Sequence, residues 1–289
     1  MIIHDTIIQA LEKYKGNNTA FLRTVIKESL QEYILNFVYT HARYKELIFT
    51  GGTCLRKIYE LSRLSEDIDF DFTDTFSIDD FANDVKSYFK TKLSYSEITT
   101  KIAGHQRSIF IRFPSILSEL QKNYPISIPS TVLFVRCDFS QDTIGMTHTE
   151  THPIATGNFS FFVRSYDLPT LFTNKMHAFL QRNFFKGSTQ SIPFKGRDVF
   201  DLMWFLEKSV KTNYKMQPNW PRLQTMTGMK TKQEIIGNVQ DKIALIKPAD
   251  IKLDLAPFIS DQQTIDTFAE HFQEILKRQL EDMNRYEAG

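Results

Sequence analysis

The sequence predicts an α+β protein in which a domain with a mixed sheet is followed by a mainly helical domain. Strand-like runs alternate with amphipathic helices as far as residue 165, whereas residues 166–289 show helical spacing nearly throughout. The 289 residues suffice for two domains, each with a core of its own. We expect these domains at residues 1–165, with helices at the N-terminus, and at residues 166–289. One large domain with insertions is the alternative.

The first half of the chain begins with a long amphipathic helix. Asn18 or Thr19 can cap it, and apolar residues recur every three or four positions as far as Phe37. A buried strand over residues 47–49 then ends at a glycine turn, and helical spacing resumes over residues 55–59. This order predicts a helix, a strand, a tight turn and a second helix before the acidic segment.

Residues 67–72 have a regular strand pattern, in which aspartates alternate strictly with apolar residues. The alternation predicts one carboxylate face and one buried face. Ser77 followed by Asp80 is similar to a capping box and starts a further amphipathic helix. Further strands are predicted over residues 108–113, 131–139 and 159–164.

The second half begins where the pattern changes from strand to helix, near residue 166. Pro169 suits the first turn of a helix, because its missing N–H would have no partner there anyway. We place the domain boundary at this point. The helical pattern is interrupted by predicted loops near residues 187–196, 218–221 and 247–257.

Charge is distributed unevenly along the chain. The net charge of +1 gives no global nucleic-acid signature, so any contact with a polyanion must come from a local excess of one sign. The acidic cluster consists of Asp67, Asp69, Asp71, Asp74, Asp79 and Asp80. The basic residues that follow are Lys175, Arg182, Lys186, Lys195, Arg197, Lys208, Lys211 and Lys215. An acidic site facing a basic wall suits a metal and a polyanion.

The cysteines and the apolar content exclude several classes of protein. Cys54 and Cys137 are too few for a disulfide framework and are not spaced as zinc ligands. The N-terminus lacks the charged start and apolar run of a signal peptide, and no long uncharged apolar stretch could span a bilayer. We expect a cytoplasmic protein without membrane contact.

The candidate site consists of a glycine turn, Gly51-Gly52-Thr53, and the acidic strand residues Asp67-Ile68-Asp69. Glycines let backbone N–H groups approach phosphate oxygens, the following helix directs its positive end at them, and Thr53 adds a hydroxyl. Carboxylates one residue apart on a strand share a face, about 6 to 7 Å apart at the Cα positions. Because Mg²⁺ prefers oxygen ligands and bridges carboxylates to phosphates, this order predicts nucleoside triphosphate chemistry.

The segment from Gly51 to Phe70 resembles the signature of the AbiEii-type nucleotidyltransferase toxins, which include abortive-infection (phage-defence) and MenT-like toxins. Arg63-Leu64-Ser65-Glu66-Asp67-Ile68-Asp69-Phe70 is similar to that family's R-x-S-x-D-[IL]-D-F pattern. The resemblance implies a DNA polymerase β-like nucleotidyltransferase domain with Asp67 and Asp69 as catalytic carboxylates. Such domains use a third carboxylate on a later strand. Asp138 is the candidate, because it lies in an apolar strand where a charge is costly; an edge-strand aspartate facing water is the alternative.

A second block, residues 171–182 followed by residues 195–202, resembles the family's E-K-L-x-A-L-x-x-R … R-D-x-x-D-L pattern, with Asn174 in place of the usual acidic residue. Lys175 lies on an otherwise apolar helix stripe, so its ammonium is expected to reach into a cleft. The resemblance implies that Lys175 contacts the triphosphate and that Asp198 either orients this lysine or assists the acceptor hydroxyl. A structural acid at a helix start is the alternative for Asp198.

The expected reaction is in-line attack of an acceptor hydroxyl on the α-phosphate of an NTP, with loss of pyrophosphate. Two Mg²⁺ ions, or Mn²⁺ in their place, are expected on Asp67, Asp69 and Asp138. The expected nucleotide contacts are Gly51, Gly52, Thr53, Ser65 and Lys175, although Ser65 in the alternative only hydrogen-bonds within the glycine turn. The candidate RNA or phosphate contacts are Arg182, Lys195 and Arg197, with solvated helix faces as the alternative.

The resemblance also suggests partners: an RNA acceptor such as the 3′ end of tRNA, and an antitoxin protein encoded nearby that restrains a bacterial toxin. The residues themselves leave three alternatives open. These are a small-molecule nucleotidyltransferase, an enzyme that modifies a hydroxyl side chain of a protein, and a catalytically silent nucleotide-binding or antitoxin-binding module. Asp67 and Asp69 argue against the last, because a degenerate site needs no two carboxylates on one strand face.

Overall fold

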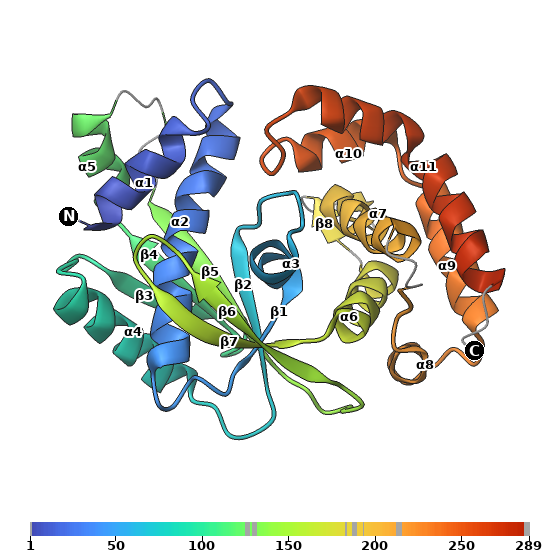
Figure 1. Ribbon diagram of the computed structural model, residues 1–289, viewed down its shortest axis with the longest axis horizontal. Helices are drawn as coiled ribbons and strands as arrows, with labels where there is room; N and C mark the ends of the chain where they lie inside the picture. The colour runs from blue at the N-terminus through green and yellow to red at the C-terminus, as the bar shows by residue number, and fades with distance from the viewer. Residues whose placement is uncertain are drawn as a thin grey trace. The chain divides into compact units, whose positions relative to one another are not determined.

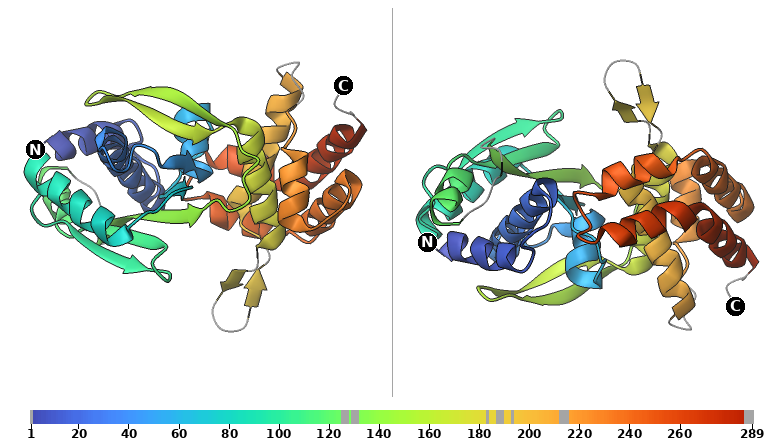
Figure 2. Two further views of the ribbon diagram at one scale, coloured as in Figure 1. Left: turned by 90° about the horizontal axis from the view of Figure 1, so that it is seen from below. Right: turned by 90° about the horizontal axis from the view of Figure 1, so that it is seen from above.

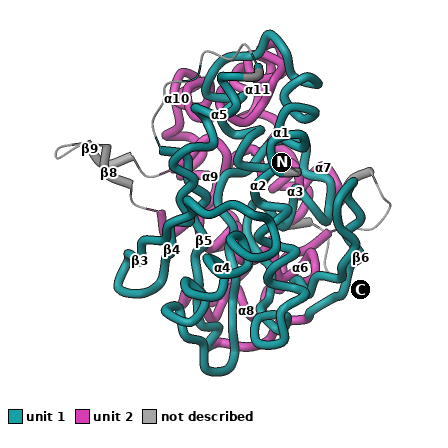
Figure 3. Tube along the Cα trace, turned by 90° about the vertical axis from the view of Figure 1, so that its left-hand side faces the viewer, with its two compact units in different colours: residues 1–143, 149–165 teal, residues 144–148, 166–289 magenta. Residues whose placement is uncertain are grey.

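The computed structural model describes residues 2–124, 128, 132–182, 184–186, 190–192, 194–211 and 216–285. The chain divides into two compact units, which Figure 3 shows in different colours. Unit 1 comprises residues 1–143 and 149–165, and unit 2 comprises residues 144–148 and 166–289. A short segment of unit 2 therefore interrupts unit 1 in the sequence.

Unit 1 contains a seven-stranded sheet in the order β3-β4-β5-β2-β1-β7-β6 (Figure 1). Its central strand β2 pairs antiparallel with β1 and parallel with β5, and β1 pairs parallel with β7. The sheet is therefore mixed, as predicted. The strands are β1 (Ile48–Thr50), β2 (Asp67–Phe72), β3 (Thr99–Ala103), β4 (Ser108–Phe113), β5 (Leu133–Gln141), β6 (Thr149–Ala155) and β7 (Ser160–Tyr166).

Five helices belong to the described part of unit 1: α1 (Ile2–Glu12), α2 (Thr19–Thr40), α3 (Gly51–Tyr59), α4 (Ile78–Lys92) and α5 (Ile116–Asn123). The caps predicted for two of them are confirmed. The Asn18 side chain accepts a hydrogen bond from the N–H of Phe21, and the Ser77 hydroxyl accepts one from the N–H of Asp80. α3 begins at the first glycine of the turn instead of after it.

The core of unit 1 lies against one face of the sheet. Phe70 of β2 and Phe139 of β5 are buried there, with ring centroids 5.7 Å apart. Phe81 of α4 packs edge-on against Phe139 at 5.0 Å, and Phe37 of α2 packs against Phe81 at 5.5 Å. Because side chains alternate along a strand, Asp67 and Asp69 lie on the opposite face.

Unit 2 is mainly helical in the part that the structure describes. Its helices are α6 (Leu168–Gln181), α7 (Gly196–Lys211), α8 (Trp220–Thr227), α9 (Lys232–Ala244), α10 (Pro248–Leu255) and α11 (Gln262–Arg285), and β8 (Phe184–Lys186) pairs with β9 (Gln190–Ile192). α7 packs against α6, α10 and α11 (Figure 2). The helix start predicted near Pro169 is confirmed, and the Asp167 side chain caps it by accepting from the N–H of Thr170.

The segment of residues 144–148 joins unit 2 through main-chain and side-chain hydrogen bonds. The N–H of Asp167 donates to the carbonyl of His148 at 3.1 Å, and the Asn219 amide donates to the carbonyl of Met146 at 2.8 Å. Arg222, which is 3% exposed, donates a guanidinium N–H to the carbonyl of Gly145. These contacts hold the segment on the first turns of α6 and α8.

The loop predicted for residues 247–257 is wrong, because α10 occupies residues 248–255. Pro248 stands in the first turn of α10, where proline is tolerated. The loop predicted for residues 218–221 ends where α8 begins, at Trp220. Residues 187–189 and 193, Thr131 and Lys215 lie outside the described residues.

None of the helices in the described part of the chain is both long enough and apolar enough to span a membrane.

Candidate active site

The turn between β1 and α3 brings backbone and carboxylate together. Gly51 has a φ of +77°, which is a left-handed conformation that favours glycine, and a Cβ added there would overlap the carboxylate of Asp69. Asp69 also pairs with Thr50 across the β1–β2 ladder. Thr50 caps α3 without any side-chain hydrogen bond, so its side chain does not satisfy the N–H groups of the first turn.

Gly52 lies against Arg63, a buried arginine for which the sequence predicts no role. A Cβ added at Gly52 would come within 2.9 Å of both Arg63 Nη2 and Ser65 Oγ. Arg63 is only 2% exposed and donates from Nη1 to the carbonyl of Leu64 at 2.8 Å. Its charge therefore adds to the positive potential of the glycine turn. The sequence feature that could have identified Arg63 is its place in the family signature, four residues before Asp67.

Thr53 and Ser65 are both buried, whereas residues that bind phosphate from solvent would be exposed. The Thr53 side chain is fully buried, and its hydroxyl donates to the carbonyl of Asp67. Ser65 is 8% exposed, and its carbonyl accepts from the Gln31 amide at 2.9 Å. Thr53 thus ties α3 to the start of β2, and its contact with a triphosphate stays a prediction.

Asp138 lies beside the acidic strand. β5 runs between β4 and β2, so the alternative of an edge strand is wrong. Asp138 pairs directly with Asp69 in the parallel β2–β5 ladder, and adjacent strands are about 4.8 Å apart. Cys137 precedes Asp138 on β5. Burial raises the pKa of the Cys137 thiol, and the negative charges of Asp138, Asp67 and Asp69 raise it further.

One oxygen of Asp138 is engaged by neighbouring side chains. Asp138 Oδ1 accepts from Arg136 Nε at 2.8 Å and from the Ser108 hydroxyl at 2.5 Å, and Arg136 Nη2 donates to the same hydroxyl at 3.2 Å. Over the residues that the structure describes, no three acidic, histidine or cysteine side chains are gathered as a metal site. The oxygen chemistry of Asp67, Asp69 and Asp138 fits Mg²⁺, and the contacts of Arg136 and Ser108 fall on Oδ1 of Asp138 and not on its second oxygen.

In unit 2, Lys175 forms a buried ion pair with Asp201. Lys175 Nζ lies 2.7 Å from Asp201 Oδ2, and the two side chains are 15% and 0% exposed. Lys175 is therefore held by Asp201 and not by Asp198, and a role for Asp198 at the acceptor hydroxyl stays a prediction. Asp198 instead stands in the first turn of α7, and its Oδ2 lies 2.6 Å from Arg182 Nε.

The comparisons with known proteins identify the family. Residues 39–287 match the family described as nucleotidyl transferase AbiEii toxin, type IV TA system. The chain belongs to the AbiEii family. It is accordingly a nucleotidyltransferase and the toxin of a type IV toxin–antitoxin system, which implies an NTP substrate and an antitoxin. Among proteins with curated descriptions, none matches the chain significantly by sequence.

Two solved structures are similar to this chain. MenT4, a nucleotidyltransferase toxin from Mycobacterium tuberculosis, has a TM-score of 0.58 and 12% identity over 99% of this chain and 90% of its own. JHP933 from Helicobacter pylori has a TM-score of 0.45 and 15% identity over 90% of this chain and 94% of its own. The likeness to MenT4 confirms the predicted α+β fold with its helical C-terminal region.

The three residues predicted as phosphate contacts of this AbiEii protein lie together. Burial lowers the pKa of Lys195, and the positive charges of Arg197 and Arg182 lower it further. The negative charges of Asp198 and Asp254 balance the cluster in part, and Asp254 also accepts from the backbone N–H of Arg197 at 3.0 Å. The side chains of Lys186, Lys211 and Lys215 lie outside the description, so the basic wall as a whole stays a prediction.

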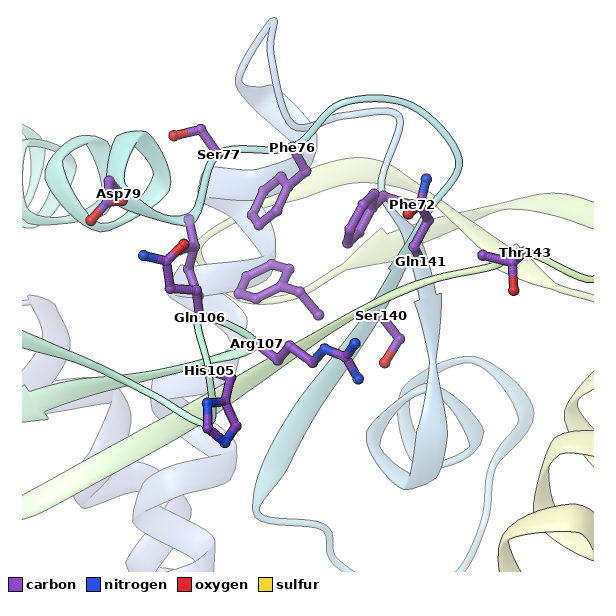
Figure 4. Close-up of a pocket in the computed structure, with 12 residues that line it drawn as sticks. Phe72, Phe76, Ser77, Asp79, His105, Gln106, Arg107, Ser140, Gln141 and Thr143 are labelled. Atoms are coloured by element: carbon purple, nitrogen blue, oxygen red, sulfur yellow. The ribbon is translucent and has the colours of Figure 1, made fainter.

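A cavity of about 730 Å³ opens in the AbiEii unit 1 where β2 and β5 end. Phe72 and Phe76 form an aromatic wall, with ring centroids 5.4 Å apart, and Figure 4 shows Arg107 extending toward Ser140 below them. None of the residues predicted for the site lines this cavity. It is therefore distinct from the carboxylate cluster.

Proposed function

We propose that the enzyme transfers an NMP from an NTP to a hydroxyl of RNA, with the 3′ end of tRNA as the acceptor, in a Mg²⁺-dependent reaction. The observation that carries the proposal is the shared sheet face of Asp67, Asp69 and Asp138, with the glycine turn packed against Asp69. Carboxylates beside uncapped helix N–H groups suit a metal–triphosphate substrate. The remaining steps follow from the side chains around this face.

Asp67 and Asp69 would hold the metal, and Asp138 would complete the set once Arg136 releases it. Bound Mg²⁺ supplies charge neutralisation on the triphosphate and lowers the pKa of an acceptor hydroxyl. Mn²⁺ offers the same oxygen preference. Arg136, once released, has a guanidinium suited to phosphate oxygens.

The glycine turn would bind the triphosphate through its backbone N–H groups, assisted by the buried charge of Arg63. Ser65 is placed beside the turn to donate a further hydrogen bond. Lys175, held by Asp201, would offset the charge that develops on the leaving pyrophosphate. Asp198 has its carboxylate on Arg182, so its place in this proposal is to position that arginine for a phosphate.

RNA is favoured as the acceptor because the cluster of Arg182, Lys195 and Arg197 is cationic, with only partial compensation by Asp198 and Asp254. An acceptor pocket for a cationic small molecule would instead be acidic. Small molecules and protein hydroxyl groups are the alternative acceptors, and the test below includes both.

The test incubates the purified protein with Mg²⁺, each α-³²P-labelled NTP in turn, and total bacterial tRNA. Asp69→Asn removes one carboxylate and is expected to abolish labelling, whereas Asp74→Asn removes an exposed aspartate beyond β2 and is expected to leave it intact. Label on tRNA that requires Asp69 and is lost with EDTA supports the proposal. Label only on a small molecule or on protein, in parallel incubations, overturns the RNA acceptor.

A further inference from the structure

The sheet face that carries the carboxylates continues onto β5, β4 and β3 as a regular array of cations and aromatic rings. Lys101 of β3 pairs with Phe110 of β4, which pairs with Arg136 of β5, which pairs with Asp67. In the same ladder, Arg112 pairs with Phe134. Directly paired residues project on the same side of a sheet, so these side chains share the carboxylate side. We call Lys101, Phe110, Arg112, Phe134 and Arg136 the cation–aromatic face.

The two sides of these strands differ sharply in burial. Ile109, Ile111, Val135 and Cys137 point to the core and are each 0% exposed. Phe110 and Phe134 alternate with them and are partly exposed, and their rings contact edge to face at 5.2 Å. Two large aromatic side chains are thus kept on a side of the sheet where the pattern calls for polar residues.

The charges around these rings are predominantly positive. The guanidinium of Arg136 lies over the Phe110 ring at 5.9 Å, and this side chain is 41% exposed although it also contacts Asp138. Among the described residues, neither the Lys101 ammonium nor the Arg112 guanidinium has a hydrogen-bond or ion-pair partner. Lys27 of α2 also lies over the Phe134 ring at 4.8 Å and pairs with Glu66, and Asp138 contacts Arg136 where β5 meets β2. A polyanion would therefore find compensating charge on β3 and β4 and the metal-binding carboxylates on β2.

We infer that the cation–aromatic face binds the single-stranded end of the acceptor RNA, with bases stacked on Phe110 and Phe134 and phosphates on Lys101, Arg112 and Arg136. This inference rests on the proposed function, because it supplies the surface that the RNA acceptor needs. Stacking on aromatic side chains requires unpaired bases, and each base offers a π-face whatever its sequence. The face is therefore expected to select for single strands and to be tolerant of sequence.

The distance from this face to the carboxylates suits an RNA end. Two inter-strand spacings and one two-residue repeat along the strand separate Phe110 from Asp69, which corresponds to about 12 Å at the Cα positions. The last few nucleotides of a single strand span such a distance. Arg136 links the two regions, since it contacts both the Phe110 ring and Asp138. Binding of an RNA phosphate by Arg136 would also release Asp138 toward the metal.

The first experiment measures equilibrium binding of a short fluorescein-labelled single-stranded RNA by anisotropy, without NTP or Mg²⁺. Phe110→Leu/Phe134→Leu keeps apolar volume but removes stacking and is expected to weaken binding at least about 10-fold. Phe162→Leu is the matched control, because Phe162 is a 67% exposed phenylalanine on β7, separated from β5 by β2 and β1. It is expected to bind like the wild type.

A second variant, Lys101→Gln/Arg112→Gln, changes no core residue and so tests the face even if the aromatic variant folds poorly. It is expected to weaken RNA binding and to reduce its salt dependence. In NMP-transfer assays both double variants should raise the KM for single-stranded RNA while leaving the KM for NTP unchanged. Preference for the single strand over the same RNA annealed to its complement should be lost with the aromatic pair.

The outcomes separate this inference from the proposed function. If the wild type labels RNA and both double variants retain its RNA affinity and KM, the face is overturned while the RNA acceptor stands. Equal wild-type binding to single-stranded and duplex RNA also overturns it, since stacking would then be absent. If the wild type neither labels nor binds RNA, the RNA acceptor fails and the face fails with it.

Discussion

At the scale of single residues, Gly51 shows how closely the backbone approaches the carboxylate. Gly51 has two separate constraints: a positive φ, and the overlap that an added Cβ would make with Asp69. Gly16 has the positive φ alone and therefore serves as a control. Gly16 has a φ of +91° and nothing within 4 Å of an added Cβ.

We predict that Gly51→Ala lowers NMP transfer by about 100-fold or more, because the alanine methyl displaces Asp69 from its place beside the turn. Backbone strain should also lower the free energy of unfolding by about 1 to 2 kcal/mol. Gly16→Ala should show the strain alone, with activity retained. Urea unfolding and labelling of RNA measure the two effects, and wild-type activity in Gly51→Ala would contradict the prediction.

The Lys175–Asp201 pair gives a second prediction at this scale. Asp201→Asn leaves the Lys175 charge in a buried site without its counter-ion, so we expect the free energy of unfolding to fall by about 3 kcal/mol. Glu46→Gln, which breaks an exposed pair with Arg164, should cost less than about 1 kcal/mol. Denaturant titration monitored by circular dichroism compares them, and equal effects would argue against a special role for the buried pair.

At the scale of elements, the contact between α3 and β2 decides how the glycine turn meets the acidic strand. Thr53 makes this contact through a hydroxyl that was expected to bind phosphate. We predict that Thr53→Val lowers stability by about 1 kcal/mol through loss of the hydrogen bond, with little change in the KM for NTP. Thr53→Ser keeps the hydroxyl and should retain the wild-type stability. A raised KM in Thr53→Val with unchanged stability would instead support direct contact with the triphosphate.

The sequence was most informative where one periodicity excluded the others. Strict alternation over residues 67–72 leaves a strand as the only element that separates aspartates from apolar residues, and β2 has these bounds. Pro248 was ambiguous, because proline both breaks helices and begins them. Only packing of α10 against α7 and α11 decides between these possibilities.

Parts of the site depended on contacts between distant elements, which a single sequence does not contain. Asp198 and Asp201 are both acids near the start of α7, and the packing of α6 on α7 determines that Lys175 meets the second of them. Asp138 could be selected as a third carboxylate, but its engagement by Arg136 and Ser108 follows from the β4–β5 register. The individual catalytic roles of these residues stay predictions.

At the scale of the whole molecule, the segment of residues 144–148 makes unit 2 dependent on a piece of chain that precedes the last strands of unit 1. We predict that Arg222→Met lowers the stability of unit 2 by about 2 kcal/mol, since a buried guanidinium hydrogen bond to Gly145 is lost. Hydrogen exchange should quicken in α6 and α8 while β2 and β5 stay protected.

The same variant has an independent readout in His177. Burial lowers the pKa of His177, and the positive charge of Arg222 lowers it further, so Arg222→Met should move this pKa upward. NMR titration of the imidazole measures the change. Arg43→Met, which removes a 55% exposed arginine of unit 1, is the control and should alter neither the exchange nor the titration. An unchanged His177 pKa in Arg222→Met would contradict the proximity of the two groups.

The interruption of unit 1 by residues 144–148 also determines when each unit can be completed during translation. Unit 1 has all its residues once position 165 has left the ribosome, whereas residues 144–148 must wait for Asn219 and Arg222. At the usual rate of translation the interval from position 165 to position 222 is roughly 3 to 11 s. During this interval the carbonyl groups of Gly145 and Met146 lack the donors on Arg222 and Asn219, so a nascent chain stalled there has the complete sheet of unit 1 while residues 144–148 are not yet held by α8.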